Sequence, residues 1–558
     1  MFKGQPKGLY FLALANTGER FGYYTMLAIF ALFLQAKFGF SNAMTSQIYG
    51  GFMACVYFLP VIGGMLADRH GYGKMVTWGI VVMFLGYLAL ALPAPQNGVG
   101  IAAMIGALFL IALGTGLFKG NLQVLVGNLY DAPKYEGRRD AAFSIFYMAI
   151  NIGSMFAPAT ATKITEYFMS KADLIYVSRI PQWANQYLDG TIQPNALAQY
   201  TELAQTQGAW NGDLAQFSQY YIDSLSGAYH WGFAVACISL VFSILVYILG
   251  RPYFKHADIN SKQLSDSGNT SVKVEELSPA ETRQRITALC LVFAVVIFFW
   301  MAFQQSGLTL TLFARDYTQL SGLTGFTRFG FNILNLVLVV IGVYGLFAIF
   351  QSEKITSRIA AAIVTLVSFG SAVWFYSKMD SSIDVLPQTF QQFNPFFVVA
   401  LTPVSLAVFG ALARRGNEPS APRKIGYGMI IAALGYLVMV FASVGMPTPN
   451  QISDGIMPDQ LALPEWLIST YLVLTLAELF LSPMGISFVS KVAPPKYKGM
   501  MMGLWFAATA IGNYLTSIIG SLWGPLPLWV LWSILIAVCS LAAIFIFSIM
   551  KRLEAVAK

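Results

Sequence analysis

The chain has 558 residues, of which 56% are hydrophobic and only 11% are charged. Soluble domains carry about 25% charged residues, so this composition excludes a chain of soluble domains. Apolar runs recur along the sequence, and each can cross a hydrocarbon core about 30 Å thick as a helix. The net charge of +8 does not indicate a nucleic-acid partner, because lysine and arginine are scattered over short loops. The sequence predicts an all-α polytopic protein of the lipid bilayer.

Fourteen apolar segments are predicted to be transmembrane helices. In chain order they are 9–36, 46–67, 75–94, 100–130, 141–169, 229–250, 286–314, 329–351, 358–379, 393–413, 425–446, 466–491, 499–522 and 527–550. An even number of spans places both termini on one side. Under this assignment 25 of the 34 lysines and arginines lie on the side of the termini and 7 on the opposite side. Since positive loops stay in the cytoplasm, we expect both termini to be cytoplasmic in a multi-pass protein of the cell (inner or plasma) membrane.

Two polar stretches divide the predicted helices. Residues 251–285 are rich in serine, lysine and glutamate and are interpreted as a cytoplasmic linker, whereas residues 170–228 are predicted to be an external insertion, either a small helical cap or a loop. Residues 1–250 then form a six-helix bundle that contains the insertion. Residues 286–558 form a second bundle, with an added helix pair at 329–379. Six plus six helices around a linker are typical of a pseudo-symmetric transporter.

Four charged residues lie deep within predicted helices, near the middle of the bilayer, where a charge costs about 3 kcal/mol on insertion scales. The first half holds Arg20 and Lys119 against Glu19, and the second half holds Glu478 alone. A cavity between the halves would therefore be positive on one wall and negative on the other. Such a field suits a zwitterion whose carboxylate and amine are separated.

The polar residues of the first predicted helix share one face. Asn16, Glu19 and Arg20 are followed by Tyr23 and Tyr24, which gives the spacing i, i+3, i+4, i+7, i+8. This pattern favours a helix that lines a water-filled cavity. The alternative is a polar helix–helix contact that seals the core of a bundle.

Several motifs resemble those of one transporter family. NTGERFGYY (16–24) resembles the first-helix ExxERFxYY motif of the proton-dependent oligopeptide transporters, a branch of the major facilitator superfamily. GGMLADRHGYGK (63–74) is similar to that superfamily's loop between helices two and three, GTGLFKGN (114–121) to the family's fourth-helix lysine motif, and FYMAINIGSMFAP (146–158) to its fifth-helix signature. Matches in the second half are FFWMAFQQSG (298–307), QQFNPFFVVALTP (391–403), AELFLSPMGISFVSKVAP (477–494) and GMMMGLWFAATAIG (499–512). The resemblance implies the major facilitator fold, two six-helix bundles plus two extra helices.

The resemblance also implies roles for single residues at the charged positions. Arg20 and Lys119 would receive the substrate carboxylate, and Glu478, with Asn151 and Asn394, would hold the amine. A zwitterionic peptide needs such counter-charges about a dipeptide's length apart, and asparagine can satisfy peptide groups whatever the side chain.

Further roles follow from the same resemblance. The aromatic substrate-binding residues would be Tyr23, Tyr24 and Tyr57 along the peptide backbone, and Trp300 and Trp505 as walls of side-chain pockets. Without the motifs, membrane-core packing is the better interpretation of these aromatic residues.

Three charged residues have implied roles outside the binding of substrate. Glu19 would carry a proton and exchange partners with Lys119. Asp68 and Arg69 are interpreted as gating and helix-end residues.

Three positions depart from the family pattern. Asn16 replaces the first acid of ExxER, Gln304 replaces the seventh-helix acid, and Leu27 replaces the first-helix arginine that pairs with that acid in relatives. Gln304 is itself a candidate substrate-binding residue. Arginine and acid are absent together, so no unpaired charge is left in the membrane. The extra pair 329–379 also follows the seventh helix, whereas we would expect it between the sixth and the seventh.

The sequence therefore predicts a secondary active importer of di- and tripeptides, driven by proton symport with reduced coupling. An uncoupled peptide facilitator stays open, as does a carrier of another small zwitterion or anion (an amino-acid conjugate, a cell-wall peptide fragment or nitrate) or a non-transporting membrane sensor. We expect no enzyme, catalytic residue, metal or cofactor, because the three histidines lie at loop edges and no paired carboxylates share a helix face. The expected partners are small peptides, protons and the bilayer.

Overall fold

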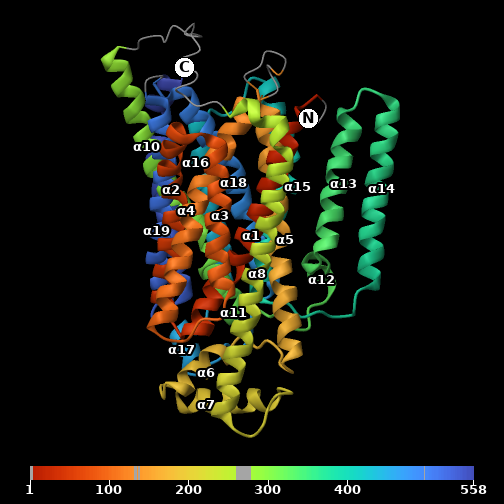
Figure 1. Cartoon of the computed structure of the whole chain (residues 1–558), viewed down its shortest axis with the longest axis vertical. Helices are drawn as coiled ribbons and strands as arrows, with labels where there is room; N and C mark the ends of the chain where they lie inside the picture. The colour runs from red at the N-terminus through yellow and green to blue at the C-terminus, as the bar shows by residue number, and fades with distance from the viewer. Residues whose placement is uncertain (1–3, 131–134, 136–138, 259–277, 495–496, 558) are drawn as a thin grey trace.

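Helices make up almost all of the described molecule. The structure, a computed structural model, describes residues 4–130, 135, 139–258, 278–494 and 497–557. Within these residues there are helices and two isolated β-bridges. The long helices run side by side in one bundle, with both ends of the chain at the same end of it (Figure 1). The predicted all-α membrane fold is confirmed.

The first half of the chain forms six long helices over the six predicted segments. Their bounds are α1 Lys7–Phe38, α2 Asn42–His70, α3 Tyr72–Ala91, α4 Gly98–Asn128, α5 Arg139–Lys171 and α8 Leu214–Phe254. Two short helices, α6 Ile180–Leu188 and α7 Pro194–Gln205, lie between α5 and α8. We call residues 170–228 the cap, because α6 and α7 cover the end of the bundle opposite the termini (Figure 1).

The second half forms the remaining helices. The long ones are α10 Pro279–Phe303, α13 Ile333–Gln351, α14 Ile355–Lys378, α15 Phe393–Arg414, α16 Ala421–Ala442, α18 Pro464–Val492, α19 Lys498–Ser521 and α20 Leu528–Ser548. The shorter ones are η2 Lys255–Ala257, η3 Gln304–Gly307, α11 Thr309–Tyr317, α12 Gly325–Phe331, η4 Pro387–Gln392, α17 Pro449–Ser453 and α21 Met550–Ala557. In the described chain, 13 helical segments are long and apolar enough to cross a membrane. The 33-residue α5 covers the other predicted segment, and the number of fourteen spans stays a prediction.

One predicted helix is broken. Residues 286–314 were expected to be continuous, but the α-helix stops at Phe303 and restarts at Thr309 after a 3-10 turn. Gly307 of this turn lies against the Tyr49 hydroxyl, where a Cβ would not fit. Gln305 donates a hydrogen bond of 3.2 Å to the backbone of α19. Such breaks are tolerated in a membrane where the freed backbone is buried in protein.

Each half has its own hydrophobic core. One core consists of residues between Leu9 and Ala257 together with Leu308, and the other of residues between Ala288 and Leu553 together with Met155. The halves meet where α2 packs against α19. Residues 259–277, most of the predicted linker 251–285, lie outside the described residues. The predicted domain boundaries stay predictions.

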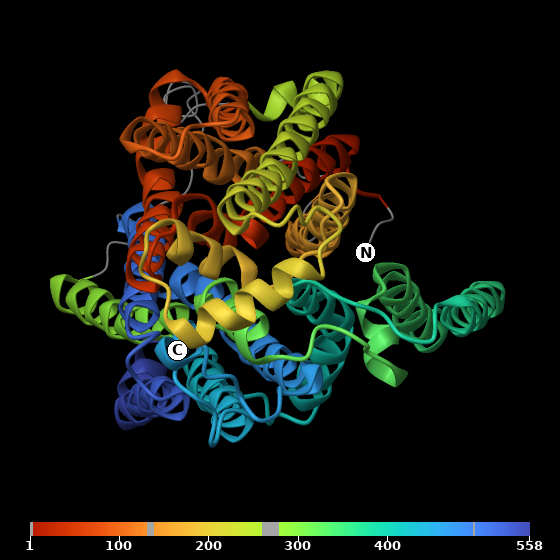
Figure 2. The same ribbon diagram turned by 90° about the horizontal axis from the view of Figure 1, so that it is seen from below.

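The additional helix pair stands beside the bundle as a hairpin of α13 and α14 (Figure 1, Figure 2). The two helices pack on each other, and α13 also contacts α15. Their outer faces are apolar and open, with Phe350 78% and Leu366 74% exposed. Such faces suit contact with lipid. The pair lies within the predicted stretch 329–379.

Candidate functional site

The positive wall of the candidate site begins on α1. Glu19 and Arg20 are adjacent and buried, and the Arg20 guanidinium donates two hydrogen bonds to the Glu19 carboxylate, one of them 2.5 Å long. The guanidinium also lies 4.7 Å from the centre of the Tyr23 ring. Glu19 is therefore paired with Arg20 in this structure, whereas the motif implied an exchange of partners with Lys119.

Lys119 of α4 supplies a second positive charge. Its ammonium lies 3.9 Å from the centre of the Tyr57 ring of α2, which is a cation–π contact. Among the described residues no carboxylate lies within ion-pair distance of Lys119. Arg20 and Glu19 act on it electrostatically. Lys119 is thus a half-buried cation held by an aromatic ring and open to an anionic ligand.

Glu478 of α18 forms the negative wall. The side chain is 8% exposed and accepts hydrogen bonds from the Asn394 amide of α15 (3.0 Å) and the Tyr147 hydroxyl of α5 (3.3 Å). Asn394 also donates to the Thr475 hydroxyl, one turn before Glu478, at 3.0 Å. In the described part of the chain no cation pairs with this carboxylate. The hydrogen-bond donors that stabilise the Glu478 carboxylate are therefore neutral groups.

Tyrosines connect the two walls. Tyr24 and Tyr57 both interact electrostatically with Arg20 and with Glu478, so the structure brings the predicted poles to the same tyrosine-lined region. Tyr23 differs, because it is 2% exposed and donates to the sulfur of Met53 at 3.2 Å. Its hydroxyl is turned into the core of the first half.

In the described part of the chain, no hydrogen bond or ion pair joins the other predicted substrate-binding residues to the charged groups. Asn151 donates to the carbonyl of Tyr147 at 3.0 Å. Trp505 is 3% exposed and packs on Phe293 in the second core. Trp300 stacks edge-on against its neighbours Phe299 and Phe303, and its buried indole N–H has no partner among the described residues. Gln304 is buried in the turn that breaks the seventh helix.

The predicted gating pair lies far along α2. Asp68 and Arg69 are exposed near its end, and Asp68 accepts a 2.6 Å hydrogen bond from the Tyr72 hydroxyl. Gly71 ends the helix with φ of +102°, a value that glycine tolerates. The helix-end role fits this geometry, and the gating role stays a prediction.

Sequence reasoning missed two residues of the Glu478 cluster. Tyr147 lies within the quoted segment 146–158, four residues before Asn151, and this spacing places both on one helix face. Thr475 lies three residues before Glu478. The i, i+4 rule applied to Asn151 would have found Tyr147, whereas a lone threonine in an apolar helix carries no distinguishing signal.

The described residues contain no group of three or more histidine, cysteine, aspartate or glutamate side chains that could hold a metal ion. What they contain is a pair of opposite, uncompensated charges across tyrosines. Such a site can bind the two ends of a zwitterion.

Comparison with known proteins identifies the family. A family model described as the POT family matches residues 73–274 and 364–525. The chain belongs to the POT family. This confirms the family that the motifs indicated, in both halves of the chain.

Individual relatives agree with this assignment. The chain is 27% identical to the peptide transporter YePEPT of Yersinia enterocolitica subsp. palearctica, over 93% of this chain and 88% of that protein. It is 26% identical to a di-/tripeptide transporter of Lactococcus lactis subsp. lactis, over 91% and 87%. A crystal structure of a POT family transporter with 5-aminolevulinic acid has a TM-score of 0.67 at 18% identity, over 100% of this chain and 98% of that one. The fold is therefore the major facilitator fold of POT transporters.

Proposed function

We propose that this POT-family protein is a secondary active transporter that imports di- and tripeptides. The observation that carries the proposal is a pair of charges without ionic partners among the described residues, the half-buried Lys119 on one wall and the buried Glu478 on the other. A free peptide presents a carboxylate at one end and an ammonium group at the other. The names of the relatives support peptides as the substrate class.

In the proposed binding mode, each end of the peptide pairs with one of the two charged residues. The peptide carboxylate replaces the missing counter-ion of Lys119, and the peptide amine takes the free lone pairs of Glu478 beside Asn394 and Tyr147. Such charge-assisted hydrogen bonds are roughly twice as strong as neutral ones. Tyr24 and Tyr57 lie where the peptide backbone would pass.

Proton coupling would act through Glu19. Its carboxylate holds Arg20, so a proton on Glu19 would release the guanidinium for the substrate carboxylate. Protonation and substrate binding would then be linked through one buried pair. Because Asn16 and Gln304 replace acids of the family pattern, we expect fewer protons per substrate than in relatives.

Orientation and domains complete the proposal. The excess of lysine and arginine on the side of the termini favours cytoplasmic termini in the cell membrane, and both ends of the chain lie at one end of the bundle (Figure 1). The residues 1–250 and 286–558 would then move as two bundles about the substrate site, and the cap would face outward.

A second candidate is a carrier of other small zwitterions, since a structural relative is described in complex with 5-aminolevulinic acid. A third is an uncoupled facilitator, which Asn16, Leu27 and Gln304 favour. One experiment separates them: uptake by purified protein in liposomes, from a panel of dipeptides, tripeptides, amino acids and 5-aminolevulinic acid, with and without an inward proton gradient. We expect peptide accumulation that requires the gradient. Exchange of peptides without any response to the gradient would establish the uncoupled facilitator. If no solute moves at all, the result would favour the non-transporting membrane sensor.

A further inference from the structure

The cap is fastened to the first half. It continues into α8, which runs without a break from Leu214 to Phe254. The Asn185 amide of α6 donates to the carbonyl of Ala36, at the end of α1, at 3.1 Å. Within the cap, the Tyr221 hydroxyl accepts from the Val177 N–H and donates to the Ile175 carbonyl. Any movement of the first half therefore carries the cap with it.

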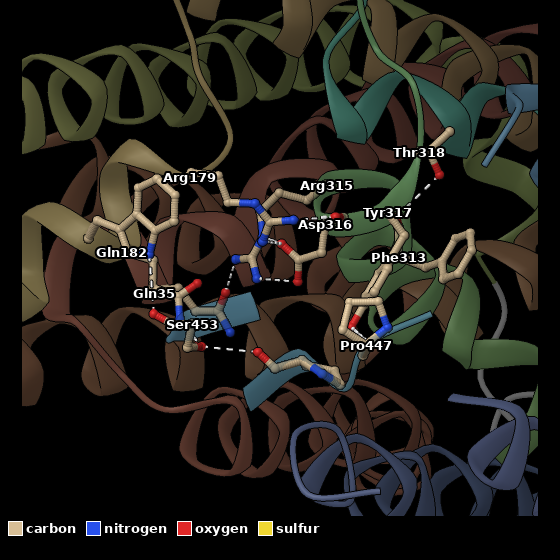
Figure 3. Close-up of polar contacts among 12 residues, drawn as sticks. Gln35, Arg179, Gln182, Phe313, Arg315, Asp316, Tyr317, Thr318, Pro447 and Ser453 are labelled. Carbon is tan, nitrogen blue, oxygen red and sulfur yellow. Dashed lines mark hydrogen bonds and ion pairs between the residues drawn. The ribbon is translucent and has the colours of Figure 1, made fainter. Parts of the chain in front are cut away.

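The same cap is bonded to the second half through a buried ion cluster. Arg179 donates to the Asp316 carboxylate at 3.0 Å and also to the Asp316 backbone carbonyl (Figure 3). Arg315 donates to the same carboxylate at 2.7 and 2.8 Å. The three side chains are 4% to 9% exposed. Arg315 also donates to Gln35 of α1, so the cluster joins both halves.

Hydrogen bonds from both cap helices extend this contact. Gln182 donates to the Ser453 hydroxyl and the Trp183 indole donates to the Ser453 carbonyl, both at α17. Gln199 of α7 donates to the Gly455 carbonyl at 2.8 Å. Seen from the capped end, the short helices lie across the middle of the molecule, between the two halves (Figure 2).

The contact combines polar groups with a cavity, unlike a close-packed hydrophobic core. A cavity of about 580 Å³ lies beside the cluster, lined by residues of the cap and of both halves, among them Gln182, Arg315 and Asp454. Polar groups at such a boundary can exchange their partners for water at small net cost. The polar bonds of this contact can therefore be exchanged for bonds to water when the two surfaces separate.

We propose that the cap is a latch that closes one end of the transport path, with the Arg179–Asp316 ion pair as its main contact. The proposal rests on the proposed transport function, because the halves of a carrier must part at each end in turn. When the capped end opens, the cap leaves with the first half and its bonds to Asp316, Ser453 and Gly455 break. Asp316 then keeps Arg315 as its partner, so no unpaired carboxylate is left behind.

The first test measures opening without any substrate. Thr318 follows Asp316 by two residues and is 3% exposed, and its hydroxyl donates to the Phe313 carbonyl of the same segment. In a background without the four native cysteines, Thr318→Cys is labelled with a hydrophilic maleimide in nanodiscs. Adding Arg179→Gln should raise the labelling rate about fivefold, since the closed state loses about the contribution of one hydrogen bond. A rate unchanged by Arg179→Gln would contradict the latch.

A matched control is available at the opposite end. Arg423 forms an exposed ion pair with Glu554, and Arg423→Gln should leave the labelling of Thr318→Cys unchanged. An equal increase for both arginine variants would mean general loosening of the fold and would overturn the proposal.

The second test closes the latch covalently. Gln182→Cys and Ser453→Cys, placed at a bonded pair, are joined by a short reducible cross-linker in liposomes, and dipeptide counterflow is measured. Cross-linking should stop counterflow and reduction of the linker should restore it. Treatment of either single cysteine variant with the same reagent should leave its counterflow unchanged, because no second cysteine is present. Counterflow that continues after cross-linking would refute the latch. If labelling responds to Arg179→Gln but no peptide is carried by any variant, the latch stands and the proposed substrate is wrong.

Discussion

Two groups of buried charges in this molecule are built in opposite ways. At the capped end, Asp316 is held between Arg179 and Arg315, so its negative charge is paired with two positive ones. Between the halves, Lys119 faces an aromatic ring and Glu478 accepts bonds from neutral groups. Under the proposals made above, the ion-paired carboxylate joins protein surfaces, whereas the charges without ionic partners bind the substrate.

Glu19 and Arg20 lie between these two cases. They are paired like the cap cluster, yet they belong to the wall that carries Lys119. A proton can undo this pairing, because it removes the negative charge of Glu19. Under the proposed coupling, protonation of Glu19 would break this ion pair and free Arg20 for the substrate.

The largest expected effect concerns the cap cluster. Asp316→Asn removes the only carboxylate between two buried arginines and should lower the free energy of unfolding by about 3 to 5 kcal/mol. Arg179→Gln leaves Asp316 paired with Arg315, so its loss should be near 1 kcal/mol, about that of one hydrogen bond. Thermal unfolding of the purified variants measures both. Equal losses would show that Asp316 is not the residue that holds the two arginines together.

The next effect concerns the positive wall. Lys119→Ala should weaken the binding of a dipeptide about a hundredfold, since charge-assisted bonds contribute up to about 3 kcal/mol. A dipeptide amidated at its C-terminus should bind equally weakly to the parent protein and to Lys119→Ala. Lys163→Ala, at a lysine with an 80% exposed side chain, is the control and should bind the free dipeptide as the parent protein does. If Lys119→Ala still binds the free dipeptide more tightly than the amidated one, Lys119 does not bind the substrate carboxylate.

Coupling gives a third prediction. Glu19→Gln keeps the size of the side chain but cannot be charged, so Arg20 is permanently released. Peptide counterflow should persist, while accumulation driven by an inward proton gradient should fall to the level found without a gradient. Uptake in liposomes measures both. A variant that still accumulates peptide would show that the proton binds elsewhere.

The smallest effect is expected at a residue that the motifs did not single out. Tyr147→Phe removes one long hydrogen bond to Glu478 and should weaken dipeptide binding about threefold, as one modest hydrogen bond does. Tyr167→Phe, on the same helix and 55% exposed against 38% for Tyr147, is the control and should have no effect. If both variants bind alike, Tyr147 does not position Glu478.

The sequence predicted the positions of the long helices because each apolar run has the length that a bilayer requires. It also predicted Lys119 and Glu478, since a charge in such a run is rare and costly. It did not predict the turn at Gln304–Gly307, because the hydrophobic pattern continues through the break. Nor could it predict the bond between Arg179 and Asp316, which are 137 residues apart and become neighbours only when the cap folds over the second half.

The central claim is that Glu478 binds the amine of the substrate from across the site. It is tested by measuring the binding of a free dipeptide and of the same peptide acetylated at its amine, to the parent protein and to Glu478→Gln. Acetylation should weaken binding to the parent protein about a hundredfold, as expected for a lost charge-assisted bond, and should change binding to Glu478→Gln little further. Equal binding of free and acetylated peptide by the parent protein would contradict the account.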